Sequence, residues 1–212
     1  MNETEQQASS EATGQESRAA DPTLGVATVT IASSRTLASD SAGKAIETAI
    51  ERTDHELTTR EHVGTDHDRV QSIVSRVIER DDVDLVVTAG ATSVEPTDIA
   101  IEAVEPLLEK KLPAFDHLFT SLAYEAVGTR VVAARTLAGV AEETPVFCLP
   151  GDEAATRLGI EEIVLPEATH LVDLARADRE REETYGTDDG DEPMGNERDD
   201  GSSGGGTTGG HE

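Results

Sequence analysis

Aromatic residues and positive charge are scarce in this chain of 212 residues. It has no Trp, two Tyr and three Phe, which is too few rings to build the stacking platforms that bind single-stranded nucleic acid. Its 17 basic residues are outnumbered by 44 acidic ones, for a formal net charge of -27. Such a charge disfavours contact with nucleic-acid backbones and anionic membranes. We therefore expect neither nucleic acid nor a membrane as a partner.

Cysteine and long apolar runs are also missing. Cys148 is the only cysteine, so intramolecular disulfides and cysteine-cluster metal sites are excluded. It lies in the apolar run 145–149, where a small buried hydrophobic residue is expected rather than a catalytic thiol. No stretch approaches 18 consecutive apolar residues, and the first residues lack the basic and apolar regions of a signal peptide. These absences predict a cytoplasmic protein.

The charged residues are unevenly spread. Residues 1–22 and 177–212 carry 17 of the 44 acidic residues and few apolar ones, so we expect a disordered acidic leader and a disordered acidic, Gly-rich tail. The remaining residues, 23–176, are expected to form the folded domain. Only three of the basic residues are Lys, and the excess of acids favours a halophilic cytosol, where salt screens repulsion. An ordinary acidic protein is the alternative.

Apolar patterning in the domain predicts an α/β fold with a mostly parallel sheet. Strands are expected at residues 26–31, 56–63, 84–88 and 146–149. Ser41 is expected to cap a helix with Ala45, Ile46, Ala49 and Ile50 on one face. The spacing of Val70, Ile73, Val74, Val77 and Ile78 predicts a second helix. Helices are also expected over residues 98–108 and along Phe115, Leu118, Phe119, Leu122 and Ala126.

The chemistry is expected in the loops that follow the strands, where α/β proteins bind ligands. Neither a Walker motif nor a Rossmann glycine fingerprint occurs. The turn at residues 90–93 either presents N–H groups and hydroxyls to a phosphate at the next helix terminus or is a plain tight turn. Asp40, Asp66 and Asp98 either cap N–H groups or hold a hydrated Mg²⁺ ion. The spacing of His62, Asp66 and His67 argues against zinc.

Six segments in order resemble the MoaB/MogA family of molybdenum cofactor biosynthesis. They are SRTLASDSAG (34–43), LVVTAG (85–90), TDIAIEA (97–103), KLPAF (111–115), YEAVGT (124–129) and PVFCLPG (145–151). The resemblance implies a three-layer α/β fold and assembly into trimers or hexamers. It also implies adenylylation of molybdopterin by MgATP with release of pyrophosphate. A later metal-insertion protein of the pathway is then a partner.

The resemblance also assigns roles to residues. It implies that Asp66 and Asp98 serve catalysis and Mg²⁺ binding, and it places phosphate or substrate contacts at Ser41, Gly43, Gly90, Ala91, Thr92, Ser93, Pro150 and Gly151. The chain departs from the family pattern at Ala91 and Ser93, where glycines are usual, at Thr97 in place of Arg, at Ala100 in place of Thr, and at Ala114 in place of Gly. Two functions follow: a molybdopterin adenylyltransferase, or a non-catalytic molybdopterin-binding or scaffold paralogue.

Overall fold

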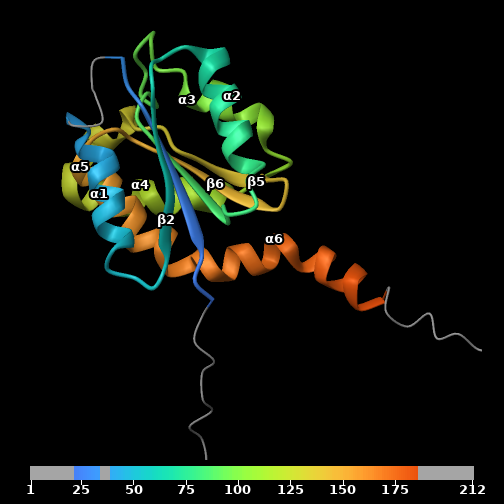
Figure 1. Ribbon diagram of the computed structural model, residues 1–212. Coiled ribbons are helices and arrows are strands. Elements are labelled where there is room, and N and C mark those ends of the chain that lie inside the picture. The colour runs from blue at the N-terminus through green and yellow to red at the C-terminus, as the bar shows by residue number, and fades with distance from the viewer. Residues whose placement is uncertain (1–21, 34–38, 186–212) are drawn as a thin grey trace, which may run out of the picture. The chain divides into compact units, whose positions relative to one another are not determined.

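A single mixed sheet of six strands forms the centre of the domain. The structure, a computed structural model, describes residues 22–33 and 39–185. The strand order is β2-β1-β3-β6-β5-β4, and Figure 1 shows β2, β6 and β5 within this sheet. The strands are β1 (Gly25–Ile31), β2 (Glu56–Val63), β3 (Leu85–Ala89), β4 (Lys110–Lys111), β5 (Leu137–Ala141) and β6 (Thr144–Leu149). Strands β2, β1, β3 and β6 pair in parallel, whereas β5 is antiparallel to its neighbours β6 and β4.

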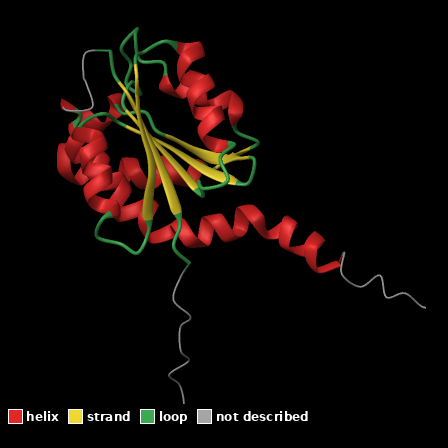
Figure 2. Cartoon of the chain, in the orientation of Figure 1, coloured by secondary structure: helices red, strands yellow, loops and turns green. Residues whose placement is uncertain are grey.

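Helices cover both faces of this sheet (Figure 2). On one face lie α1 (Ser41–Ile50), α4 (Pro113–Val127), α5 (Glu153–Gly159) and the start of α6 (Leu165–Tyr185), which α5 joins through a π-helical turn at Ile160–Val164. On the other face lie α2 (His67–Ile78) and α3 (Ala100–Val104). The expected three-layer α/β fold is therefore confirmed.

The central strands are apolar because both of their faces are covered. In β1, Val26 packs with the α1 layer, and Ala27 and Val29 pack with the α2 layer. Strands buried on both sides are typical of parallel sheets between helices. Cys148 of β6 is fully buried, as expected, and this burial raises the pKa of its thiol to about 12. A thiol in this state is a packing residue at neutral pH.

The structure corrects several details. Two strands, β4 and β5, were not expected. The helix expected over residues 98–108 is only Ala100–Val104, followed by a 3₁₀ turn at Glu105–Leu107, since Pro106 lacks the N–H that an α-helix needs. Within α4, Phe115 and Phe119 are buried, but Leu118 is 54% exposed.

The chain separates into two units, residues 1–177 and 178–212. Of the second unit the structure describes residues 178–185, which are helical. Disorder was expected over residues 1–22 and 177–212; residues 177–185 belong to the helix α6, and residues 1–21 and 186–212 lie outside the described residues. Across residues 22–33 and 39–185, no helix is long and apolar enough to cross a membrane.

Candidate functional site

The connections of the sheet mark one edge as the place for a ligand. From β1 the chain moves to β2 on one side, and β3 then returns to the other side of β1. The helix after β1 lies on one face of the sheet, and the helix after β3 lies on the opposite face. Ligands of open α/β sheets bind at such a switch point, outside the carboxyl ends of the strands. The ends of β1 and β3, at Ile31 and Ala89, therefore frame the candidate site.

Three strand ends meet closely at this edge. The N–H of Gly90, just after β3, donates to the Leu149 carbonyl at the end of β6 over 3.0 Å. A Cβ added to Gly90 would lie 2.4 Å from the Ile31 carbonyl oxygen, and one added to Gly151 would lie 2.9 Å from the Gly90 Cα. Gly90 also has a φ of 103°, which disfavours other residues. The ends of β1, β3 and β6 thus form a floor of backbone atoms.

The turn after β3 is held by its own side chains and backbone. Ser93 N–H donates to Asp98 Oδ2 over 2.8 Å, and Ala100 N–H donates to the Ala91 carbonyl over 2.8 Å. Thr92 is buried, with 3% of its surface exposed. Ala91 has a φ of 51°, a left-handed conformation that costs an alanine free energy. The departure from glycine at this position is therefore a strained one.

Asp98 does not cap the following helix. The N-cap of α3 is Ile99, which makes no capping hydrogen bond through its side chain. Residues 94–99 also separate the turn from this five-residue helix, so the structure does not place the turn directly at a helix terminus. Asp98 instead accepts the Ser93 N–H and closes the loop between these two residues, so it satisfies a backbone N–H without capping a helix.

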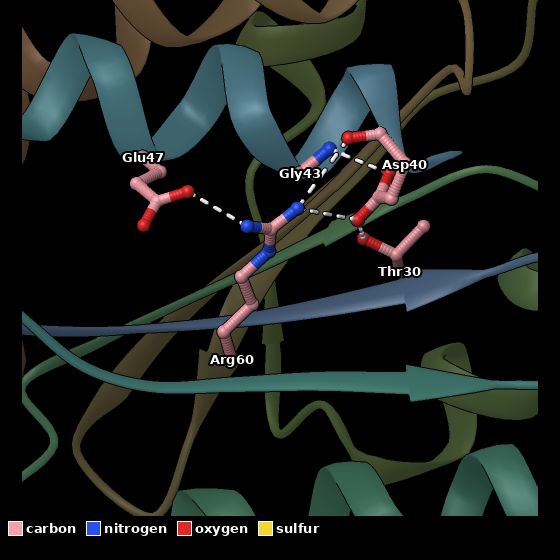
Figure 3. Close-up of polar contacts among 5 residues, drawn as sticks. All are labelled: Thr30, Asp40, Gly43, Glu47 and Arg60. Carbon is pink, nitrogen blue, oxygen red and sulfur yellow. Dashed lines mark hydrogen bonds and ion pairs between the residues drawn. The ribbon is translucent and has the colours of Figure 1, made fainter. Parts of the chain in front are cut away.

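The start of α1 is held by a buried aspartate (Figure 3). Asp40, not Ser41, is the N-cap, and its Oδ1 accepts the Gly43 N–H over 2.8 Å. Its Oδ2 accepts the Thr30 hydroxyl over 2.6 Å and Arg60 Nη2 over 3.2 Å. Arg60, from β2, also donates to Glu47 over 2.7 Å. Asp40 is 3% exposed, so this network holds the start of α1 against β1 and β2.

Gly43 is required for this packing. A Cβ at this position would lie 2.1 Å from Asp40 Oδ2 and 2.8 Å from the Thr30 hydroxyl oxygen. Ser41, by contrast, is half-buried in the first turn of α1. Burial works against ionisation of Asp40, but the hydrogen bonds from Thr30, Gly43 and Arg60 outweigh it and hold the pKa of Asp40 below its usual value.

Asp66 lies at the neighbouring loop, after β2. It is the N-cap of α2, and its exposed carboxylate accepts the Arg69 N–H over 2.9 Å. The next residue, His67, contacts the Glu102 carbonyl of α3 over 3.3 Å and the Asp68 carboxylate over 3.0 Å. Asp66 therefore caps α2, and Asp98 comes one residue before the N-cap of α3, a helix that packs against α2. No hydrogen bond joins these two described residues directly. His62 lies on β2, apart from the cap.

Arg135 is a further residue of the candidate site, and it was not expected from the sequence. It comes just before β5, and β5 begins beside the end of β6 because Leu137 pairs with Cys148 in antiparallel register. Arg135 Nη1 donates to the Ser93 carbonyl over 3.4 Å, and its Nη2 donates to Glu102 over 2.6 Å. Without β5 in the expected sheet, no sequence pattern places this arginine at the carboxyl edge.

No group of three or more His, Cys, Asp or Glu side chains within residues 22–33 and 39–185 is arranged to hold a metal ion. Two surface pockets are lined by other residues. One lies along α4, from Asp116 to Tyr124, and the other between residues 53–55 and the start of α6. Neither pocket includes the residues described above, so the candidate site is defined by its strand ends and loops.

Comparison with known proteins identifies the family. A family model described as a probable molybdopterin binding domain matches residues 24–170. The molybdenum cofactor biosynthesis protein B of Staphylococcus epidermidis is 36% identical over 157 residues, which cover 69% of this chain and 86% of that protein.

Solved structures agree with this match. A crystal structure of molybdenum cofactor biosynthesis protein B has a TM-score of 0.73 and 31% identity, over 75% of this chain and 99% of that one. The tungsten cofactor synthesizing protein MoaB from Pyrococcus furiosus has a TM-score of 0.64 and 29% identity, over 73% and 98%. The fold, the matched domain and these relatives together show that the chain belongs to the MoaB/MogA family of molybdenum cofactor biosynthesis proteins.

Proposed function

We propose that this protein transfers the adenylyl group of ATP to molybdopterin, before a later protein of the pathway inserts the metal. The observation that carries the proposal is the meeting of three strand ends at Gly90 and Gly151, in a chain whose family model describes molybdopterin binding. In this reaction a phosphate oxygen of molybdopterin attacks the α-phosphorus of ATP. The bond between the α-phosphorus and the bridging oxygen breaks, and pyrophosphate leaves.

The residues at the carboxyl edge divide the work of binding. Gly90, Ala91, Thr92 and Ser93 approach the phosphates, with Thr92 and Ser93 supplying hydroxyls. Ser41 and Gly43 line the pterin side, where the Asp40 network fixes the first turn of α1. Pro150 and Gly151 close the floor beneath them. Gly43 and Ser93 are held by aspartate side chains and Gly90 by the Leu149 carbonyl, so these parts of the site are positioned before the reactants bind.

Two carboxylates of this chain fit a Mg²⁺ ion that arrives with ATP. Magnesium is commonly held by one or two carboxylates together with substrate phosphates, rather than by a cage of protein ligands. Asp66 and Asp98 each use one oxygen to accept a backbone N–H, which leaves the carboxylate charge to attract a cation. The ion would neutralise charge on the triphosphate as it reacts. The role of Asp66 and Asp98 themselves is to orient the phosphates against the turn at Gly90.

One observation favours a second candidate, a non-catalytic molybdopterin-binding or scaffold paralogue. Ala91 has a left-handed backbone that suits glycine better, and Ser93 adds a second side chain to the same turn. Extra atoms where a phosphate must approach the backbone closely weaken turnover before they weaken the fold.

The test is incubation of the purified protein with molybdopterin and MgATP, with detection of the adenylylated product. Asp66→Asn and Asp98→Asn should each abolish product formation, because an amide is a poor ligand for Mg²⁺. The amide introduced by Asp98→Asn still offers an oxygen to the Ser93 N–H, so this variant removes charge without opening the loop. Unchanged melting of both variants is the control.

A restored turn separates the two candidates. Ala91→Gly and Ser93→Gly, combined with Thr97→Arg, should raise the rate if the departures only obstruct the phosphates, because glycine opens the turn and arginine adds a phosphate ligand. Recovery of about 2.7 kcal/mol of transition-state binding corresponds to about a hundredfold in rate. If neither the native chain nor this folded variant forms product, the enzyme proposal fails and the scaffold candidate replaces it.

A further inference from the structure

Ser93, in the turn after β3, is held through both its backbone N–H and its backbone carbonyl. Its N–H donates to Asp98 Oδ2 over 2.8 Å, and its carbonyl accepts Arg135 Nη1 over 3.4 Å. Arg135 therefore lies against the turn that the proposed function assigns to phosphate. It reaches this place only because β5 runs antiparallel to β6 and begins at the carboxyl edge.

A phosphate at this turn needs a positive charge that the turn itself lacks. The N–H groups of Gly90 and Ser93 are already donated to Leu149 and Asp98, so two of the four N–H groups of residues 90–93 are committed within the protein. The chain is also strongly acidic, with a net charge of -27, which repels a triphosphate. Of the basic side chains in the described ranges, Arg135 is the one with a hydrogen bond to this turn.

The guanidinium is held ready by a carboxylate that an anion can displace. Arg135 Nη2 donates to Glu102 Oε1 over 2.6 Å, and the two side chains are 33% and 52% exposed. An ion pair this exposed contributes little to stability. A phosphate carries more charge than a carboxylate and matches the arginine fork equally well. Displacement of Glu102 by phosphate is therefore favourable.

We propose that Arg135 binds a phosphate group of the substrates at the turn after β3, and that Glu102 is its counter-ion until the phosphate arrives. The inference rests on the proposed function and adds a residue to it. The phosphate belongs either to ATP or to molybdopterin, and the chemistry at the guanidinium is the same for both. The two sources are separated by titrating each compound alone.

The experiment measures the dissociation constants of ATP and of molybdopterin for single variants at one fixed ionic strength. Arg135→Gln should weaken binding of at least one of the two about tenfold, and Arg135→Lys should weaken the same compound less. Glu102→Gln should tighten it severalfold, because the guanidinium loses its competitor. Opposite effects from the two partners of one ion pair distinguish ligand binding from a structural role, in which both variants weaken binding.

A matched ion pair at the far end of α1 supplies the controls. Arg52 donates to Glu161 over 3.0 Å, with side chains 67% and 31% exposed. Arg52→Gln and Glu161→Gln make the same changes in net charge and should alter neither dissociation constant more than about twofold. Equal effects of Arg135→Gln and Arg52→Gln would overturn the inference.

The two proposals fail in different ways. If the native protein binds ATP and molybdopterin and forms product, but Arg135→Gln binds both as tightly, then only the role of Arg135 is wrong. If the native protein binds neither compound, then the proposed function and this inference are both wrong. Melting curves of every variant show that the fold is retained in each comparison.

Discussion

At the scale of single residues, Asp40 is expected to matter most for stability. It combines a helix cap with buried hydrogen bonds to Thr30 and Arg60, and a buried partner left unsatisfied is costly. Asp40→Ala should lower the free energy of unfolding by about 3 kcal/mol, measured in urea at neutral pH. Asp66→Ala, which removes an exposed cap, should cost about 1 kcal/mol. Equal costs would show that burial of Asp40 adds nothing.

The pH dependence of the stability follows from the direction in which the Asp40 pKa is shifted. The pKa of Asp40 is lowered in the folded state from the reference value of 3.8, so its ionised form stabilises the fold fully above that value. This contribution is lost as the pH falls through the lowered pKa. The difference in unfolding free energy between the native chain and Asp40→Asn should therefore be constant near neutral pH and shrink below pH 3.8. A constant difference in acid would contradict the assignment.

Ala91 is expected to be a site of strain. Its φ of 51° costs an alanine about 1–2 kcal/mol. Glycine removes this strain, but it also increases the conformational entropy of the unfolded chain, which cancels part of the gain in stability. Ala91→Gly should therefore raise the free energy of unfolding by about 0.5–1 kcal/mol, seen as a higher melting temperature. Ala114→Gly, in the helical first turn of α4, is the control and should give no increase. Equal gains from both would mean that φ is not the cause.

At the scale of elements, the sequence predicted what its apolar pattern strongly specifies. The strands ending at Ile31 and Leu149 and the helix carrying Val70 to Ile78 are confirmed, because each has a run or period that buries one or two faces. It did not predict β5, whose Leu-Ala-Gly-Val-Ala segment has only two large apolar residues. A strand this weak in local propensity is set by its partners in the sheet.

The site was predictable to the extent that it follows strands. The loops after β1, β3 and β6 were expected from their sequence positions, and the structure brings their ends together. The partners of those loops were not, since Thr30, Arg60 and Arg135 lie 10, 20 and 42 residues from the groups they contact. Contacts of this range depend on strand order and direction, which neither period nor composition contains.

At the scale of the whole molecule, charge should control stability. We propose that the excess acid is an adaptation to salt, because self-repulsion weakens a compact state until ions screen it. The melting temperature should rise between dilute buffer and molar KCl. Molar sucrose, which stabilises without screening charge, is the control, and an equal gain in both would remove the electrostatic explanation.

The proposed domain boundaries give a second test at this scale. A chain of residues 23–176 should keep one cooperative melting transition, because the removed residues are poor in apolar side chains that a core would use. A chain that ends at Tyr185, where the described helix stops, separates the role of this helix from that of the tail. Loss of cooperativity in the shorter chain alone would move the boundary to Tyr185.

We also propose that the protein is a homo-oligomer, a trimer or a hexamer. Phe115 and Phe119 of α4 are buried in the core of the domain, so they are not available for contacts between subunits. The exposed apolar side chains in this region are Leu118, Tyr124, Val127 and Val132. Sedimentation should give a species well above the 22.4 kDa monomer, and Val132→Glu, which charges a side chain 88% exposed, should reduce its mass. A native monomer at micromolar concentration would contradict the proposal.

The close contact between Gly90 and Gly151 has a consequence for how such proteins diverge. Since the floor of the site consists of backbone atoms, it presents the same surface whatever side chains surround it, provided that these two positions remain glycine. Under the proposed function, differences in selectivity between relatives are then expected to arise from the rim, at positions such as Ser41, Ser93 and Thr97. Exchanging rim residues between family members is therefore a route to altered substrate preference that leaves the sheet untouched.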